Sequence, residues 1–112
     1  MSLKMWIESA LKESGWTFDQ IMDGVQSGDF FLFENEGGCL VCEIISSPRH
    51  KVFHCFAAGG DLESLRPLIL EAEAYGRLVG CDAAGGTGRT GWVRALRNMG
   101  YTAAVPAVEK EL

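Results

Sequence analysis

The sequence predicts a single α+β domain over residues 1–112, in which a mostly antiparallel sheet is flanked by helices. Three strand-like runs follow one another with only short turns between them, and such close connections make antiparallel neighbours. Segments with the apolar spacing of amphipathic helices precede and follow these runs. A second domain would be too small to bury its own core, because the chain has only 112 residues.

Two amphipathic helices are expected first. In residues 3–14 the apolar positions form one stripe at helical spacing. Thr17, with Gln20 three residues later, matches the capping box that begins a helix. This second helix is expected to be short, because glycine disfavours the helical conformation and occurs at Gly24 and Gly28.

Three strands are predicted next, at residues 30–34, 39–45 and 51–58, each bounded by turn residues. Few polar residues occur on either face of these runs, so both sides of the sheet are expected to be covered. Gly59 and Gly60 end the third strand.

The central helix is predicted from an apolar stripe between residues 65 and 79. Asp61 or Ser64 can cap it. Pro67 favours the cap at Ser64, because proline is tolerated only in the first turn of a helix. Glu73 is expected on the solvent side of this helix.

The rest of the chain predicts a weak strand at 81–84, a glycine-rich loop at 85–91, a short helix at 92–99 and a final strand at 101–110. Pro106 confines part of that last strand to an edge or a bulge. The predicted order is therefore α-α-β-β-β-α-β-α-β.

Cys39 and Cys42 form a CxxC motif, which can indicate a zinc or redox site. Both are expected within one strand, where side chains three positions apart point to opposite faces. A metal needs convergent ligands, and no second CxxC or HxxxH motif follows. We interpret the cysteines as small buried hydrophobic residues in a reducing compartment.

Charge and hydropathy argue against two classes of partner. A net charge of −5 repels nucleic-acid phosphates, and the densest basic stretch holds only Arg89, Arg94 and Arg97. No apolar run approaches the ~20 residues that span a bilayer, and the first segment is an amphipathic helix rather than a secretion signal. We therefore expect a cytoplasmic protein with no membrane contact and no nucleic-acid partner.

Motifs in a fixed order occupy the second half of the chain. A G-R-T-G-W run at 88–92, a G-Y step at 100–101 and a K-E-L ending at 110–112 follow a helix that ends in the stretch 75–81. This combination resembles short GNAT-like proteins (the acyl-CoA N-acyltransferase fold) common in tailed-phage genomes, and the predicted element order is similar to the GNAT fold. The resemblance implies a location in the host cytoplasm or in the virion.

The resemblance also implies where a cofactor would bind. GNAT enzymes hold the pyrophosphate of CoA on backbone N–H groups where a strand meets the central helix, with the signature R/Q-x-x-G-x-G/A. Here Gly59 and Gly60 lie at that place and can expose backbone, but no Arg or Gln has the required spacing. Asp61 and Glu63 put two negative charges there, so acetyl-CoA is possible but not favoured.

The implied catalytic groups are also incomplete. The position of the family's proton-donating tyrosine holds Leu96, which cannot transfer a proton. Tyr75 and Tyr101 are interpreted as core aromatic residues. Glu43 and His54 are candidate bases that can face one another across neighbouring strands, or alternatively a solvated or Arg-paired acid and a hydrogen-bonded, half-buried histidine.

The candidate cofactor-binding residues are therefore Gly59, Gly60, Arg89 and Trp92, with no metal ligand and no assigned catalytic residue. Arg89 can bind an anion, while Trp92 can stack on a base or acyl group or can instead anchor the last helix. Two functions stay open. One is a non-catalytic module that binds a protein partner or itself in phage assembly or host takeover. The other is an acetyl-CoA-dependent N-acetyltransferase with an atypical clamp.

Overall fold

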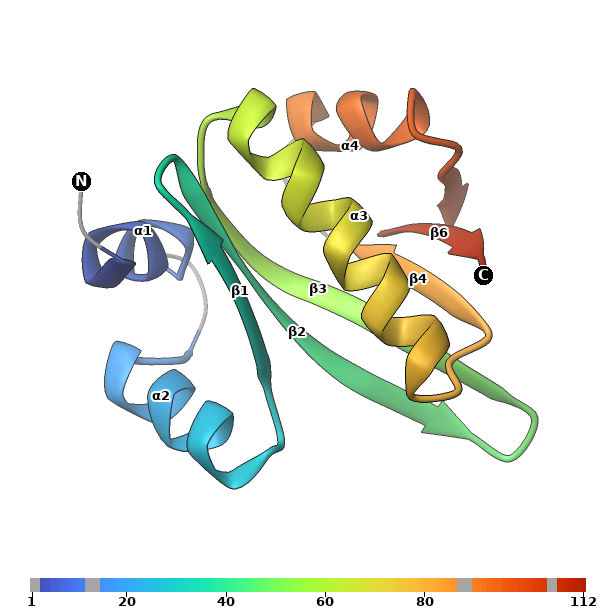
Figure 1. Ribbon diagram of the computed structural model, residues 1–112, viewed down its shortest axis with the longest axis horizontal. Coiled ribbons are helices and arrows are strands. Elements are labelled where there is room, and N and C mark those ends of the chain that lie inside the picture. The colour runs from blue at the N-terminus through green and yellow to red at the C-terminus, as the bar shows by residue number, and fades with distance from the viewer. Residues whose placement is uncertain (1–2, 12–14, 87–89, 105–106) are drawn as a thin grey trace.

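The computed structural model describes residues 3–11, 15–86, 90–104 and 107–112 (Figure 1). Helices and strands follow the predicted order with one additional strand at the end. The elements are α1 (Leu3–Ala10), α2 (Phe18–Ser27), β1 (Phe31–Asn35), β2 (Gly38–Ser47), β3 (His50–Gly60), α3 (Leu62–Leu78), β4 (Ala83–Gly86), α4 (Thr90–Arg97), β5 (Thr102–Ala104) and β6 (Ala107–Glu111).

A six-stranded sheet in the order β1-β2-β3-β4-β6-β5 organises the fold. All neighbouring strands are antiparallel except β3 and β4, which run parallel because α3 connects them. α3 crosses one face of the sheet with α4 beside it, and α1 and α2 lie at the β1 side (Figure 1). One apolar core forms beneath α3 and α4, and a second forms beneath α1 and α2. The prediction that both faces are covered is therefore confirmed where these helices lie, whereas residues 44–47 of β2 are exposed.

The second helix begins as predicted. The Thr17 side chain accepts a hydrogen bond from the Gln20 backbone, and the Gln20 side chain accepts one from the Thr17 backbone. The expectation that Gly24 shortens the helix is wrong. Gly24 lies inside α2, and a side chain there would collide with the ring of Phe30, so the glycine permits close packing; Gly28 alone ends the helix, with a φ of 87°.

The central helix begins earlier than Pro67 suggested. α3 starts at Leu62, directly after Asp61, whose side chain caps it, and Pro67 lies within the helix. β3 continues to Gly60, so the cap at Asp61 leaves no room for the later start. Glu73 is also not on the solvent side as expected; only 2% of it is exposed.

The C-terminal part departs from prediction in two places. Gly85 and Gly86 belong to strand β4 rather than to a loop, and they pair with His54 and Cys55 of β3. The expected single strand at 101–110 is a hairpin of β5 and β6, with β5 at the sheet edge. Pro106 lies between the two strands, outside the described residues.

The expectation that Cys39 and Cys42 are buried and point to opposite faces of the sheet is confirmed. Cys39 belongs to the core beneath α1 and α2, whereas Cys42 belongs to the core beneath α3, so the two thiols lie on opposite faces. No group of potential metal ligands occurs among the described residues. None of the helices described here is long and apolar enough to cross a bilayer.

Gly60 offers a direct test of the fold. Its φ is 113°, and an added side chain would collide with the Gly37 carbonyl oxygen in the β1–β2 turn. We expect Gly60→Ala to lower the free energy of unfolding by about 3 kcal/mol. Gly80→Ala is the matched control, because Gly80 also has a positive φ but faces open space; about 1 kcal/mol is expected there. Equal losses in urea denaturation would contradict the steric argument.

The buried thiol of Cys39 predicts a loss of stability in alkali. Burial raises the pKa of this thiol to about 11. Because the unfolded thiol ionises at lower pH, its contribution is complete below about pH 8 and is lost as the pH rises to about 11. We expect the free energy of unfolding to fall about 2 kcal/mol less over this range in Cys39→Ala than in the wild type. If the free energy of unfolding fell equally with pH in both proteins, the raised pKa of Cys39 would be contradicted.

Candidate functional site

The junction of β3 and α3 is the place where the GNAT resemblance puts the pyrophosphate of CoA. Gly59 pairs with Cys39, and Gly60 pairs with Gly38, so both candidate glycines are part of the β2–β3 ladder. Asp61 is the sole residue between the strand and the helix. The two glycines thus carry the strand directly into the helix and form no phosphate-binding loop.

The Asp61 side chain caps the start of α3 and engages the donors of Ser64. The Asp61 carboxylate accepts bonds from the Ser64 backbone N–H at 2.8 Å and from the Ser64 hydroxyl at 2.9 Å. The Asp61 backbone N–H donates to the Gly37 carbonyl at 3.3 Å. The bonds from Ser64, first from its backbone and then from its side chain, lower the pKa of the Asp61 carboxyl, so this group stays charged. With Glu63 exposed in the first turn, the helix start presents negative charge to solvent.

β3 extends beyond its pairing with β4. Their parallel pairing runs from Val52 and Ala83 to Cys55 and Gly86, and among the described residues no strand pairs with 56–60 on the β4 side.

Phe56 does not fill the space between β3 and β4. It is the extra residue at an irregularity of the β2–β3 register, between Cys55 and Ala57. Its ring packs against Phe30, with 5.0 Å between centroids, in the core beneath α1 and α2. The two remaining candidates are not placed: Arg89 lies outside the described residues, and of Trp92 only the backbone, within α4, is described.

A cavity of about 20 Å³ lies beside the last paired residues of β3 and β4. Such a volume holds about one water molecule and no acyl chain. Its lining is mostly apolar, with two cysteines, one carboxylate and one phenol; the residues are Leu40, Cys42, Phe53, Cys55, Ile69, Ala72, Glu73, Ala84, Gly85, Gly86, Leu96 and Tyr101. Leu96, at the position expected for the proton donor, is a core side chain here.

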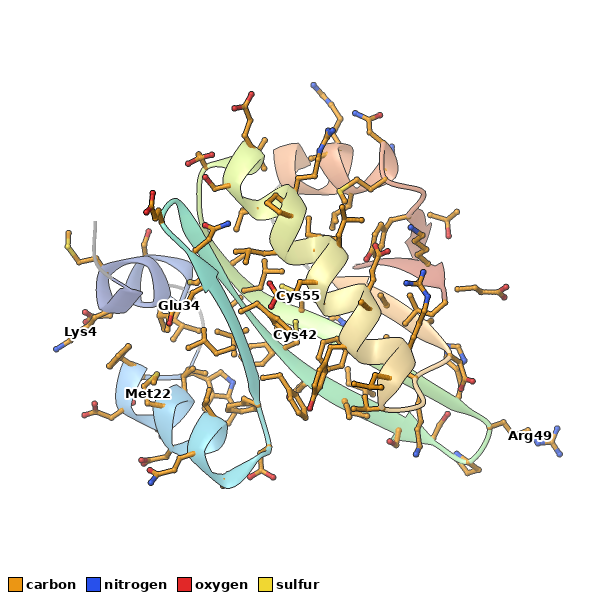
Figure 2. The ribbon with its side chains drawn as sticks, in the orientation of Figure 1. Lys4, Met22, Glu34, Cys42, Arg49 and Cys55 are labelled. Atoms are coloured by element: carbon orange, nitrogen blue, oxygen red, sulfur yellow. The ribbon has the colours of Figure 1, made fainter. Side chains whose placement is uncertain are left out.

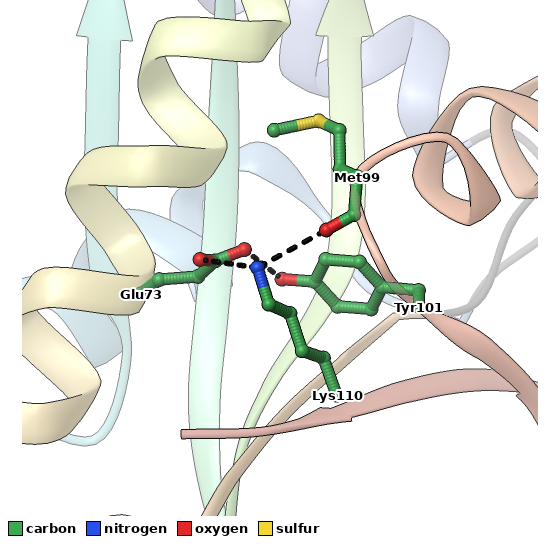
Figure 3. A network of polar contacts seen from close by, with 4 residues as sticks. All are labelled: Glu73, Met99, Tyr101 and Lys110. Atoms are coloured by element: carbon green, nitrogen blue, oxygen red, sulfur yellow. Dashed lines mark hydrogen bonds and ion pairs between the residues drawn. The ribbon is translucent and has the colours of Figure 1, made fainter.

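A buried polar cluster adjoins this cavity (Figure 3). The Tyr101 hydroxyl donates to the Glu73 carboxylate at 2.8 Å, and the Lys110 ammonium forms an ion pair with it at 3.2 Å. Lys110 also donates to the Met99 carbonyl at 3.0 Å. A buried carboxylate needs such partners, because its desolvation would otherwise be costly. The cluster fastens α3 to the end of α4 and to β6.

Tyr101 cannot easily serve as an acid for a substrate. Burial, and then its hydrogen bond to Glu73, raise the pKa of the phenol. The phenol keeps its proton, and its hydroxyl donates a hydrogen bond to the Glu73 carboxylate. The interpretation of Tyr101 as a core aromatic residue is therefore correct but incomplete. Tyr75 packs against three phenylalanine rings of the same core.

Glu43 and His54 are neighbours, as the sequence allowed. They are direct partners in the antiparallel β2–β3 register, and both are half-buried. Directly paired residues point to the same side of a sheet, and alternation from Cys42 places this pair on the side away from α3.

Sequence reasoning missed Glu73 and Lys110. A usable signal existed for Glu73: it follows Ile69 by four residues and therefore lies on the apolar stripe of α3. No comparable signal identified Lys110 as its partner, because the hairpin that carries this lysine was predicted as a single strand.

The Glu73–Lys110 pair can be tested by a double-mutant cycle. We expect Lys110→Met to lower the free energy of unfolding by about 2 kcal/mol, because a charged carboxylate then loses its cation, which is itself partly exposed. In a Glu73→Gln background the same change should cost less than about 1 kcal/mol. Lys51→Met, at an exposed lysine of β3, is the control. Equal costs in both backgrounds by urea denaturation would contradict the coupling.

Comparison with known proteins supports the fold and goes no further. No protein-family model and no curated protein matches the sequence. A GNAT-family acetyltransferase from Listeria monocytogenes 4b F2365 is similar in structure, with a TM-score of 0.60 and 19% sequence identity over 95% of this chain and 83% of that chain. Likeness at this identity shows a shared architecture only, so this chain has a GNAT-like fold.

Proposed function

We propose that this chain is a non-catalytic GNAT-like binding module, of the kind encoded in tailed-phage genomes, and that its partner is a protein. The observation that carries the proposal is the charged Asp61 side chain that caps the start of α3. A CoA pyrophosphate would need free backbone donors there, and the Asp61 carboxylate already occupies the Ser64 N–H. In the same proposal, the protein acts in the host cytoplasm or in the virion.

Two further features support a role without catalysis. The cavity beside the last paired residues of β3 and β4 is too small for an acyl group. The phenol beside it is committed to Glu73, and Leu96 offers no proton.

A working N-acetyltransferase with an unusual clamp is the second candidate. The continuation of β3 beyond its last pair with β4 favours it, because the resemblance to GNAT enzymes implies that two strands separate to admit the pantetheine arm of CoA. The pairing of Glu43 with His54 next to that point favours it too, because a histidine beside a carboxylate can act as a base. In this version Gly59, Gly60 and Arg89 would hold the cofactor.

Calorimetric titration with acetyl-CoA separates the two candidates. We expect no saturable binding to the wild type at millimolar ligand, because charge and occupied donors oppose a pyrophosphate. The Asp61→Ser/Glu63→Gln variant keeps a capping side chain and removes both charges, so any residual affinity should increase in it.

Saturable binding to the wild type that weakens in Arg89→Ala would overturn the proposal and support the transferase. Arg66→Ala is the matched control, since Arg66 is an exposed arginine of α3. Loss of binding in both variants would indicate nonspecific attraction of an anion, which leaves the binding-module proposal standing.

A further inference from the structure

The far half of β2 has a free edge. β1 pairs with β2 only as far as Cys42, whereas β2 continues to Ser47. Among the described residues no strand pairs with 43–47 on that side, and the β2–β3 hairpin projects beyond the start of β1 (Figure 1). Alternate residues of this five-residue segment therefore direct unpaired N–H and C=O groups to the free side, while the others pair with β3.

This edge has little of the usual protection against pairing, because Glu43 is the one charged residue among 43–47. Natural proteins place lysine, proline or a bulge in exposed edges. Here Ile44 and Ile45 occupy the middle of the segment, with exposed fractions of 36% and 46%. The polar residues Ser46 and Ser47 follow, and Pro48 in the turn ends the segment.

We infer that a second copy of this chain pairs with this edge, β2 against β2, about a two-fold axis at Ile45. This inference rests on the proposed binding function, because it names the partner. In the antiparallel register Ile45 meets Ile45 of the other copy, Ile44 lies opposite Ser46, and Glu43 lies opposite Ser47. No like charges face one another, and an apolar pair occupies the centre.

The lengths of the two free segments match. β1 begins opposite Cys42, so a partner strand can extend only to the position opposite Glu43. In this register that position is taken by Ser47 of the other copy, which is the last residue of its strand. The turn of each copy therefore reaches the start of β1 in the other without overlapping it.

Charge complementarity also favours a second copy. The chain carries a net charge of −5, but the hairpin tip is basic, with Arg49 pointing away from the body of the chain (Figure 2). The register brings this guanidinium toward Asp29 of the other copy, which lies exposed just before β1. Two symmetric Arg49–Asp29 pairs result, and they offset part of the repulsion between acidic chains.

Sedimentation velocity over a concentration series tests the inference. A five-residue edge contact is small, so we expect a weak dimer that is populated at about 100 µM. Ile45→Lys places two ammonium groups at the two-fold axis and should raise the dissociation constant at least about tenfold. Leu70→Lys is the matched control, because Leu70 is an exposed leucine of α3, and it should leave the dimer unchanged. Circular dichroism checks that each variant is folded.

Charge exchange tests the register itself. Arg49→Asp and Asp29→Arg should each weaken the dimer about threefold, and the double variant should restore it. A wild type that stays monomeric, or an Ile45→Lys variant that dimerises normally, would overturn the inference. A double variant as weak as either single one would overturn the two-fold register. Acetyl-CoA titration of the Ile45→Lys variant reports on the proposed function separately, since the edge and the start of α3 share no residue.

Discussion

The uninterrupted passage of β3 into α3 constrains the rest of the structure. Gly60 has a backbone conformation that side chains disfavour, and this lets the strand pair with β2 up to its last residue. Asp61 then caps the helix at once, so α3 lies close across the sheet and buries the core beneath it. The same passage leaves no loop for a phosphate, so the geometry that secures the core also argues against the cofactor.

A polar cluster completes the far side of that core. Glu73 projects from α3 into the interior, and its partners come from the segment after α4 and from β6. A buried ion pair of this kind stabilises a protein little more than apolar packing of the same volume would. An arrangement that leaves the buried carboxylate without its partner is strongly destabilised, however. The cluster therefore favours one docking of the C-terminal hairpin over its alternatives.

Local sequence signals predicted most of the fold and less of the site. The Thr17–Gln20 capping box and the three apolar runs act within a few residues, so they could be recognised directly. The partnership of Glu73 with Lys110 depends on packing between elements 37 residues apart, and no local signal reports it. Gly85 and Gly86 looked like a loop by composition, because only tertiary pairing with β3 makes them a strand. The sequence could suggest that Glu43 and His54 are neighbours, but only the register between β2 and β3 shows it.

All four cysteines are buried, and the pKa values of Cys39, Cys42 and Cys81 are raised, in each case with burial among the causes. Thiols of this kind react slowly with alkylating reagents near neutral pH, because the nucleophile is the thiolate. A single cysteine introduced on the surface would thus react faster than these buried thiols. Fluorophores or spin labels can be attached to it without first removing the natural cysteines from the core.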